Sequence, residues 1–151
     1  MFNDNFYMEL AKLTALNSKD PKTKVGAVLV KDSRVLSLGY NGAPRNFPDD
    51  LLPKESNPDS PLVEQKNTYM VHAEVNAILN YGGSLKDLEG STLYVTVSPC
   101  IECSKILVQC GVKKIIYLEE YHRDNIWETA KVILTLGRVQ FKKFNENKLY
   151  L

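Results

Sequence analysis

Cysteine, histidine and tryptophan are scarce in this chain of 151 residues, which has three cysteines, two histidines and one tryptophan. Three cysteines are too few for the disulfide framework of a small secreted protein, and two of them form a C-x-x-C pair, Cys100 and Cys103. Such a pair fits a metal site in a reducing compartment better than it fits a disulfide.

An excess of charge of one sign is also lacking, because 19 basic residues face 18 acidic ones and the formal net charge is +1. Binding of long nucleic acid draws on basic side chains that displace counterions from the phosphates. Without an excess of basic residues, the chain is poorly suited to such binding. No charged leader opens the chain, and no apolar run approaches the roughly 18 residues that suggest a membrane span. We therefore expect a cytoplasmic protein with a small-molecule partner and neither a nucleic-acid nor a membrane partner.

The length and a hydrophobic fraction of 44% predict a single domain over residues 1–151. Phe6, Leu10 and Leu13 recur at helical spacing and predict an N-terminal helix with these residues inward. We expect further helices over 72–81, 100–110 and 126–136, and strands over 25–30, 35–40, 93–97, 115–118 and 139–144. The alternation indicates an α/β fold, a three-layer α/β/α sandwich around a mixed five-stranded sheet.

One long segment interrupts this alternation. Residues 41–70 contain five of the seven prolines, so no regular element is expected to span them. A loop of this length in a compact domain is usually functional or disordered.

Two short segments form the main chemical motif of the chain. His72-Ala73-Glu74 and Pro99-Cys100-Ile101-Glu102-Cys103 match the H-x-E…P-C-x-x-C pattern of zinc deaminases. His72, Cys100 and Cys103 supply three ligands, so a tetrahedral zinc would keep an open position for water. Glu74 remains free to move protons. The motif predicts one catalytic zinc and hydrolytic chemistry.

Other interpretations of the cysteines stay open. The C-x-x-C pair alone could be a redox pair or half of a structural zinc site. Cys110 follows Cys103 by seven residues and could close a four-ligand site on the same helix face. A protein whose zinc only holds the fold would have no use for a carboxylate beside an open position, so Glu74 favours an enzyme.

The chain resembles the cytidine and deoxycytidylate deaminase superfamily and, within it, the deoxycytidylate (dCMP) deaminases. The zinc motif is typical of the superfamily, and the long insertion before it is typical of the narrower family. The resemblance covers nearly the whole chain, through Lys24-Val25-Gly26-Ala27, Gly39-Tyr40-Asn41-Gly42-Ala43-Pro44, His72-Ala73-Glu74-Val75-Asn76-Ala77-Ile78, Ser98-Pro99-Cys100-Ile101-Glu102-Cys103 and Tyr121.

This resemblance implies zinc-dependent deamination of dCMP to dUMP and ammonia, which supplies dUMP for thymidylate synthesis. It implies that Glu74 shuttles protons, that Asn41 hydrogen-bonds the deoxyribose and that backbone around Ser98 contacts the base or the zinc-bound intermediate. Asn41-Gly42 is also a turn signature that could merely end a strand. For the dianionic 5′-phosphate, the candidate donors are Lys22, Lys24 and Tyr121.

The resemblance further implies a homohexamer that dCTP activates and dTTP inhibits, with Mg²⁺ accompanying a bound triphosphate. The candidate effector contacts are Gly39, Tyr40, Gly42 and Arg45. Rival substrates on the same scaffold are free cytidine or deoxycytidine, a tRNA adenosine, guanine and a riboflavin precursor. The balanced charge argues against tRNA, and a single-domain length argues against the riboflavin precursor.

Overall fold

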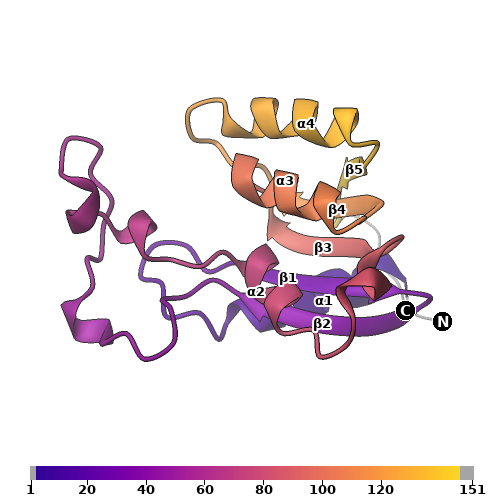
Figure 1. Ribbon diagram of the computed structural model, residues 1–151, viewed down its shortest axis with the longest axis horizontal. Coiled ribbons are helices and arrows are strands. Elements are labelled where there is room, and N and C mark those ends of the chain that lie inside the picture. Colours follow the sequence, from indigo (N-terminus) through magenta and orange to yellow (C-terminus); the bar gives the residue numbers. More distant parts are fainter. Residues whose placement is uncertain (1–2, 147–151) are drawn as a thin grey trace.

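A mixed five-stranded sheet organises the chain, and the computed structural model describes it over residues 3–146 (Figure 1). Every predicted helix and strand is present. In chain order they are α1 Asp4–Ala15, β1 Gly26–Lys31, β2 Arg34–Tyr40, α2 Ala73–Leu79, β3 Thr92–Val97, α3 Ile101–Gln109, β4 Lys114–Glu119, α4 Ile126–Leu136 and β5 Gln140–Lys143. The strand order is β2-β1-β3-β4-β5; β1 runs antiparallel to both neighbours, and β3, β4 and β5 are parallel.

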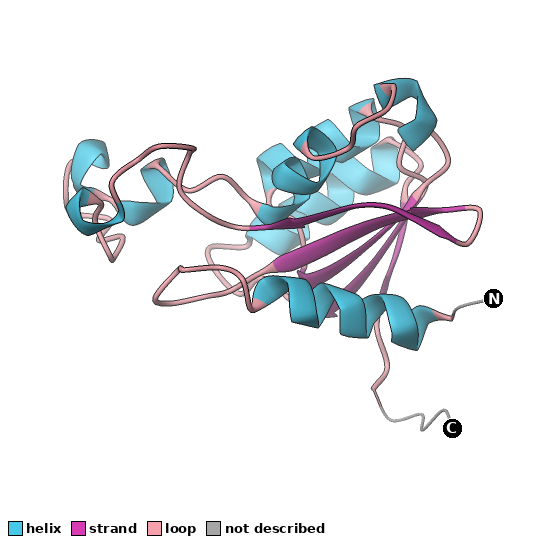
Figure 2. Cartoon of the chain, turned by 90° about the horizontal axis from the view of Figure 1, so that it is seen from below, coloured by secondary structure: helices cyan, strands magenta, loops and turns pink. Residues whose placement is uncertain are grey.

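The sheet is covered on both faces, as predicted for a three-layer α/β/α sandwich. Figure 2 shows α1 on one face and α2, α3 and α4 on the other. Side chains of β1 alternate between the two layers, because successive residues of a strand point to opposite faces. Ala27 and Leu29 pack in the cluster under α2, α3 and α4, whereas Val28 and Val30 pack in the cluster under α1.

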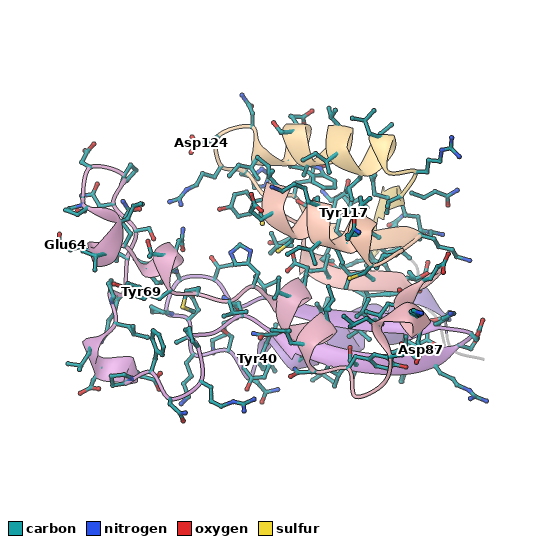
Figure 3. The ribbon with its side chains drawn as sticks, in the orientation of Figure 1. Tyr40, Glu64, Tyr69, Asp87, Tyr117 and Asp124 are labelled. Atoms are coloured by element: carbon teal, nitrogen blue, oxygen red, sulfur yellow. The ribbon has the colours of Figure 1, made fainter. Side chains whose placement is uncertain are left out.

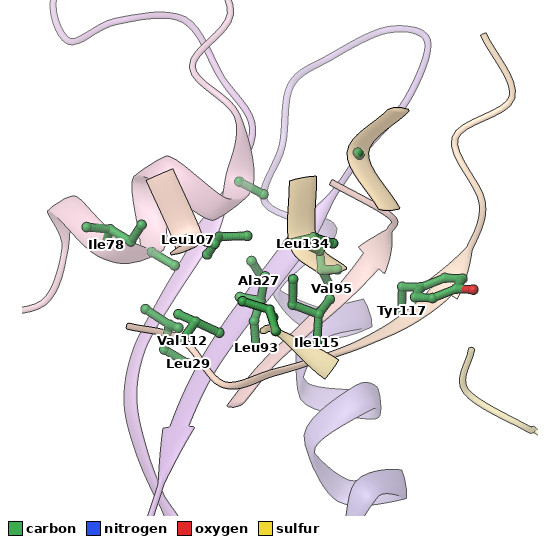
Figure 4. Packing of buried hydrophobic residues seen from close by; sticks show 14 of the residues in the cluster. Ala27, Leu29, Ile78, Leu93, Val95, Leu107, Val112, Ile115, Tyr117 and Leu134 are labelled. Atoms are coloured by element: carbon green, nitrogen blue, oxygen red, sulfur yellow. The ribbon is translucent and has the colours of Figure 1, made fainter. Parts of the chain in front are cut away.

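The larger core lies between the sheet and the three helices α2, α3 and α4 (Figure 4). Leu93, Leu107 and Ile115 are fully buried at its centre. Burying such side chains stabilises the fold by about 1.5–3 kcal/mol each relative to leaving them exposed. This core fixes α2 and α3 on the sheet, and both helices begin at residues of the zinc motif.

The prediction for the inward face of α1 is wrong for two of its three residues, whereas Leu10 is partly buried and packs against the cluster under α1. Phe6 and Leu13 are 42% and 61% exposed, and the buried face is instead formed by Tyr7, Met8, Ala11, Thr14 and Ala15. The reason is a close approach between α1 and β1. A Cβ added to Gly26 would lie 2.0 Å from the Ala11 carbonyl oxygen, so this contact requires small residues on both sides.

Residues 43–70, the arm, extend away from the sheet as a long excursion (Figure 1). As expected, no long element spans it; it holds only the short 3₁₀ turns η1 Asp49–Leu51, η2 Leu62–Glu64 and η3 Lys66–Thr68. Figure 3 shows Glu64 and Tyr69 on the arm and Tyr40 near its base, with Asp87 towards the other end of the molecule. Gly42 and Val71 close the base of the arm through reciprocal backbone hydrogen bonds of 3.0 and 2.7 Å.

Candidate active site

The predicted site residues lie at one edge of the sheet. The parallel strands β3 and β4 end at this edge, and β1 begins there because it runs antiparallel to β3. Gly26 pairs with Tyr40, and its N–H donates to the Thr96 hydroxyl at 3.1 Å. Residues that follow β2, β3 and β4, or precede β1, therefore meet here. The sequence candidates among them are Lys24, Asn41, Ser98 and Tyr121.

His72 reaches this edge through the base of the arm. It follows Val71, which is bonded to Gly42, and it forms the N-cap of α2. The Asn76 side-chain amide on α2 donates to the Tyr40 carbonyl at 2.8 Å. Gly39 brings α2 and β2 together, since a Cβ at this position would lie 2.2 Å from the Ala77 nitrogen. The absence of a side chain at Gly39 thus lets α2 carry His72 and Glu74 close to the sheet.

Three side chains form a compact ligand set. The sulfurs of Cys100 and Cys103 each lie 3.4 Å from His72 Nδ1, and all three ligand atoms lie within 4.8 Å of one another. A tetrahedral zinc with ordinary Zn–S and Zn–N bonds puts neighbouring ligand atoms about 3.6 Å apart. The set therefore fits zinc, with Nδ1 as the ligand nitrogen of His72. Cys110 lies outside it, half-buried at the C-cap of α3.

The two thiols differ in acidity because they share a hydrogen bond. The hydrogen bond with Cys103 lowers the pKa of Cys100, and His72 lowers it further. The same bond to Cys100, followed by burial, raises the pKa of Cys103. The bond with Cys100 raises the pKa of His72 to about 8. Metal binding near neutral pH must therefore release protons from His72 and Cys103, since zinc takes neutral imidazole and thiolate.

Glu74 lies beside the ligand set and outside it. Its side chain sits in the first turn of α2, and the residue is only 4% exposed. Burial raises the pKa of this carboxyl, because it disfavours the charged form, while the charge of His72 acts in the opposite direction. A carboxyl with a raised pKa exchanges protons near neutral pH more readily than an ordinary one. Its place and its acidity suit proton transfer.

Ser98 ties together the ends of the two central parallel strands. Its N–H donates to the Glu119 carbonyl at 2.8 Å, and its hydroxyl accepts from the Tyr121 N–H at 2.7 Å. Ser98 and Pro99 are both buried, and Cys100 follows them directly as the N-cap of α3. The seryl hydroxyl thus fixes the turn that presents Cys100, and contact of this backbone with a base stays a prediction.

Asn41 does more than end β2. Its side-chain oxygen accepts from the Val25 N–H at 2.8 Å, and its amide nitrogen donates to the Thr23 carbonyl at 2.9 Å. These bonds hold the segment that precedes β1 against the end of β2. Both ends of the amide are therefore engaged by the protein, and the bond from Asn41 to a deoxyribose stays a prediction.

The remaining candidates are dispersed around this edge. Lys24 is exposed, and the Lys22 ammonium pairs with Glu55 of the arm at 2.9 Å. Among the candidate effector contacts, Tyr40 and Arg45 are exposed, whereas Gly39 is buried under α2. The structure therefore gives Gly39 a packing role, and its contact with an effector stays untested.

A buried ion pair at this edge is absent from the residues predicted from the sequence. Lys66 of the arm donates to the Asp20 carboxylate at 2.9 Å, and both residues are buried. One signal was present for Asp20, because Asp commonly accepts from the N–H two residues on, and here it does so from Lys22 at 2.8 Å. Lys66 gave no signal, since its partner lies 46 residues away.

Comparison with known proteins agrees with this geometry. Residues 1–119 match the family described as the cytidine and deoxycytidylate deaminase zinc-binding region. The chain is 39% identical over 146 residues to a probable deoxycytidylate deaminase of Drosophila melanogaster, covering 93% of this chain and 71% of the relative. It is 38% identical over 141 residues to the deoxycytidylate deaminase of Mus musculus, covering 92% and 78%.

A solved structure shows the same arrangement. The crystal structure of dCMP deaminase from the cyanophage S-TIM5, in complex with dCMP and dUMP, aligns with a TM-score of 0.70 and 30% identity, and covers 95% of this chain and 100% of that chain. The sequence match, the shared fold and a His72, Cys100 and Cys103 cluster that fits zinc all agree. The chain belongs to the cytidine and deoxycytidylate deaminase family.

Proposed function

We propose that this chain catalyses the hydrolytic deamination of dCMP to dUMP and ammonia, and so supplies dUMP for thymidylate synthesis. The observation that carries the proposal is the buried carboxyl of Glu74 beside a three-ligand set that leaves a fourth position open. The similarity to proteins named deoxycytidylate deaminases supports the choice of substrate.

When bound, zinc would lower the pKa of a coordinated water towards about 7 and supply hydroxide at neutral pH. His72, Cys100 and Cys103 would hold the ion. Glu74 would accept a proton from the water, deliver it to ring N3 so that C4 becomes more electrophilic, and later protonate the departing amine. One water is consumed, its oxygen becomes O4 of dUMP, and ammonia leaves.

Burial of Glu74 matters in this scheme because a carboxylate in bulk water would stay ionised and return protons poorly. At 4% exposure the group is shielded from competing water, and its raised pKa brings its charged and neutral forms closer in free energy. Both forms occur in the proposed cycle.

Recognition of the nucleotide would use the same sheet edge. In support, Asn41 directly precedes Gly42, and Gly42 is bonded to Val71, the residue before His72. Lys24 and Lys22 lie in the exposed segment that precedes β1. Together with Tyr121 after β4, they are our candidates for the dianionic phosphate.

The substrate is tested by comparing dCMP with deoxycytidine, CMP and cytidine, measuring ammonia release and the uracil product together. We expect the highest kcat/KM with dCMP. Glu74→Gln, prepared in the same way, reports any contaminating deaminase. Equal kcat/KM for dCMP and deoxycytidine would remove the phosphate-recognition claim and favour a nucleoside deaminase.

Regulation is a further part of the proposal: a homohexamer activated by dCTP with Mg²⁺ and inhibited by dTTP. In support, the arm begins directly after Gly42 and ends directly before Val71. A movement of the arm can therefore shift both Asn41, which precedes Gly42, and His72, which follows Val71. A triphosphate would act by binding one of two conformations more tightly. Light scattering combined with initial rates at varied dCMP tests this, and a monomer with hyperbolic kinetics unaffected by either triphosphate would reject it.

A further inference from the structure

Three ion pairs join the arm to the segment between α1 and β1. Lys19 pairs with Asp49 at 3.1 Å and Lys22 pairs with Glu55 at 2.9 Å, and all four of these side chains are exposed. The third pair differs. Lys66 and Asp20 lie 2.9 Å apart with side chains only 10% and 3% exposed.

The buried pair matters more because of where its charges lie. Exposed ion pairs contribute little to stability, since water solvates their charges almost as well as the partner does. A buried charge without a partner is costly, so a buried pair fixes the geometry of the elements that carry it. Lys66 and Asp20 therefore specify where the returning limb of the arm meets the body of the molecule.

Asp20 is the centre of a hydrogen-bond network that leads to Asn41. Its Oδ1 accepts from Lys66 Nζ at 2.9 Å and from the N–H groups of Lys22 and Thr23 at 2.8 and 3.0 Å. Its Oδ2 accepts from the Asn41 side chain at 3.4 Å. The turn that Asp20 holds also presents the Thr23 carbonyl, which accepts from Asn41 at 2.9 Å.

The same pair acts on the other side of the site. Lys66 precedes His72 by six residues, and the intervening chain is fixed at Val71 by its bonds to Gly42. The Lys66 N–H also donates to the Glu55 carbonyl within the arm at 2.9 Å. The ion pair thus joins the segment that leads into the metal ligands to the segment that holds Asn41.

We propose that Asp20 and Lys66 are positioning residues of the active site. Through the turn at Thr23 they fix the Asn41 side chain, and through the arm they fix the approach to His72, so that binding of the substrate depends on the pair. This inference rests on the proposed function for the identity of the substrate. The contacts that support it are those of Asp20 and Lys66 described above. The exposed pair between Lys19 and Asp49 has no such role.

The test compares Lys66→Met with a matched control, Asp49→Asn, which removes the exposed pair between the arm and Lys19. With dCMP, at a temperature well below the unfolding transition and with measured zinc content, we expect Lys66→Met to raise KM about tenfold, equivalent to about 1.4 kcal/mol. The expected kcat stays within about threefold, because Glu74 and the ligands are unchanged, and both constants of the control stay within about twofold of the wild type. A lower melting temperature with unchanged KM would make the pair purely structural and overturn the proposal.

A double variant tests the route through Asn41. If Lys66 acts through Asn41, then Lys66→Met combined with Asn41→Ala should have a kcat/KM within about twofold of Asn41→Ala alone. Losses that multiply would show that the two residues act independently and would overturn this route. Asp20→Asn keeps the shape of the side chain and serves in place of Lys66→Met if that variant does not fold.

Hydrogen exchange gives a readout that needs no substrate. In Lys66→Met, and in Asp20→Asn, the amides of Val25 and Val71 should exchange faster than in Asp49→Asn, since Val25 donates to Asn41 and Val71 to Gly42. Unchanged exchange at both amides would overturn the proposal. If the wild-type chain fails to deaminate dCMP, the proposed function fails, and exchange alone still decides whether the pair positions Asn41.

Discussion

At the scale of single residues, the site depends on two kinds of side chain. His72 and Glu74 stand close together in one motif and Cys100 and Cys103 in another, and the roles predicted for them follow from residue type and spacing. The buried residues that surround them act over long sequence separations. The metal ligands are the most direct case for a test, because the structure offers a third cysteine outside the cluster.

Cys103→Ala should bind zinc much more weakly than the wild type. Loss of even a neighbour that orients a ligand typically costs about 10- to 100-fold in metal affinity, so loss of a ligand should cost at least about 100-fold. Cys110→Ala is the control and should keep one zinc per chain. Metal analysis of the purified proteins checks this, and full zinc occupancy in Cys103→Ala would remove Cys103 from the ligand set.

Asp20 should give the protein a pH-dependent contribution to stability. Burial raises the pKa of this carboxyl, but the bonds from Lys66 and from two backbone N–H groups outweigh it, and the folded pKa lies below the usual 3.8. A depressed folded pKa stabilises the fold above the unfolded pKa, and this contribution is lost as the pH falls through the folded value.

The wild type should therefore be more stable to denaturant than Asp20→Asn near neutral pH, and the difference should shrink below about pH 4. Denaturant titrations of both proteins at several pH values measure it. A difference that stays constant down to the acid limit would mean that the Asp20 carboxylate does not stabilise the fold through its charge.

At the scale of elements, two glycines set how closely helices approach the sheet. Gly26 faces α1 and Gly39 faces α2, and a Cβ at either would lie within 2.2 Å of helix backbone. This explains why the stripe of α1 was predicted wrongly: large residues such as Leu13 cannot enter so narrow a contact, so alanines occupy it. In α4 the buried face consists of Trp127, Ala130 and Leu134.

Gly39→Ala should destabilise the fold and weaken zinc binding together. The new methyl group would push α2 away from β2, at a typical cost of about 1–3 kcal/mol for an overpacked contact. Because α2 carries His72 at its start, the ligand set would be disturbed as well. Gly82→Ala is the control, since nothing lies within 4 Å of a Cβ there. Equal unfolding free energies for the two variants would contradict this packing.

At the scale of the whole molecule, the gathering of site residues at one edge of the sheet can be predicted from the sequence. The buried ion pair that holds the arm to the body of the molecule cannot. The alternation of helices and strands implies that the ends of β3 and β4 meet, and hence that Ser98 and Tyr121 lie together. Lys66 shows no such regularity, because it sits among short turns and its partner Asp20 is remote in sequence. Long-range polar pairs of this kind leave no local pattern.

None of the helices in residues 3–146 combines the length and apolar character that a membrane span needs.

In the described part of the chain, the sheet edge brings α2 and α3 together so that Glu74 lies beside His72, Cys100 and Cys103. The proposed hydrolysis depends on this convergence, since it assigns the proton transfers to Glu74.

Glu74→Gln is the most direct test, with zinc content, folding and turnover of dCMP measured on the same preparation. The amide has a similar shape and cannot accept and return a proton, so zinc and fold should be retained. The kcat should fall by at least about 10²–10⁴, the usual range for a general acid–base group. A loss of only a few fold at full zinc occupancy would show that another group moves the protons and would contradict the role assigned to Glu74.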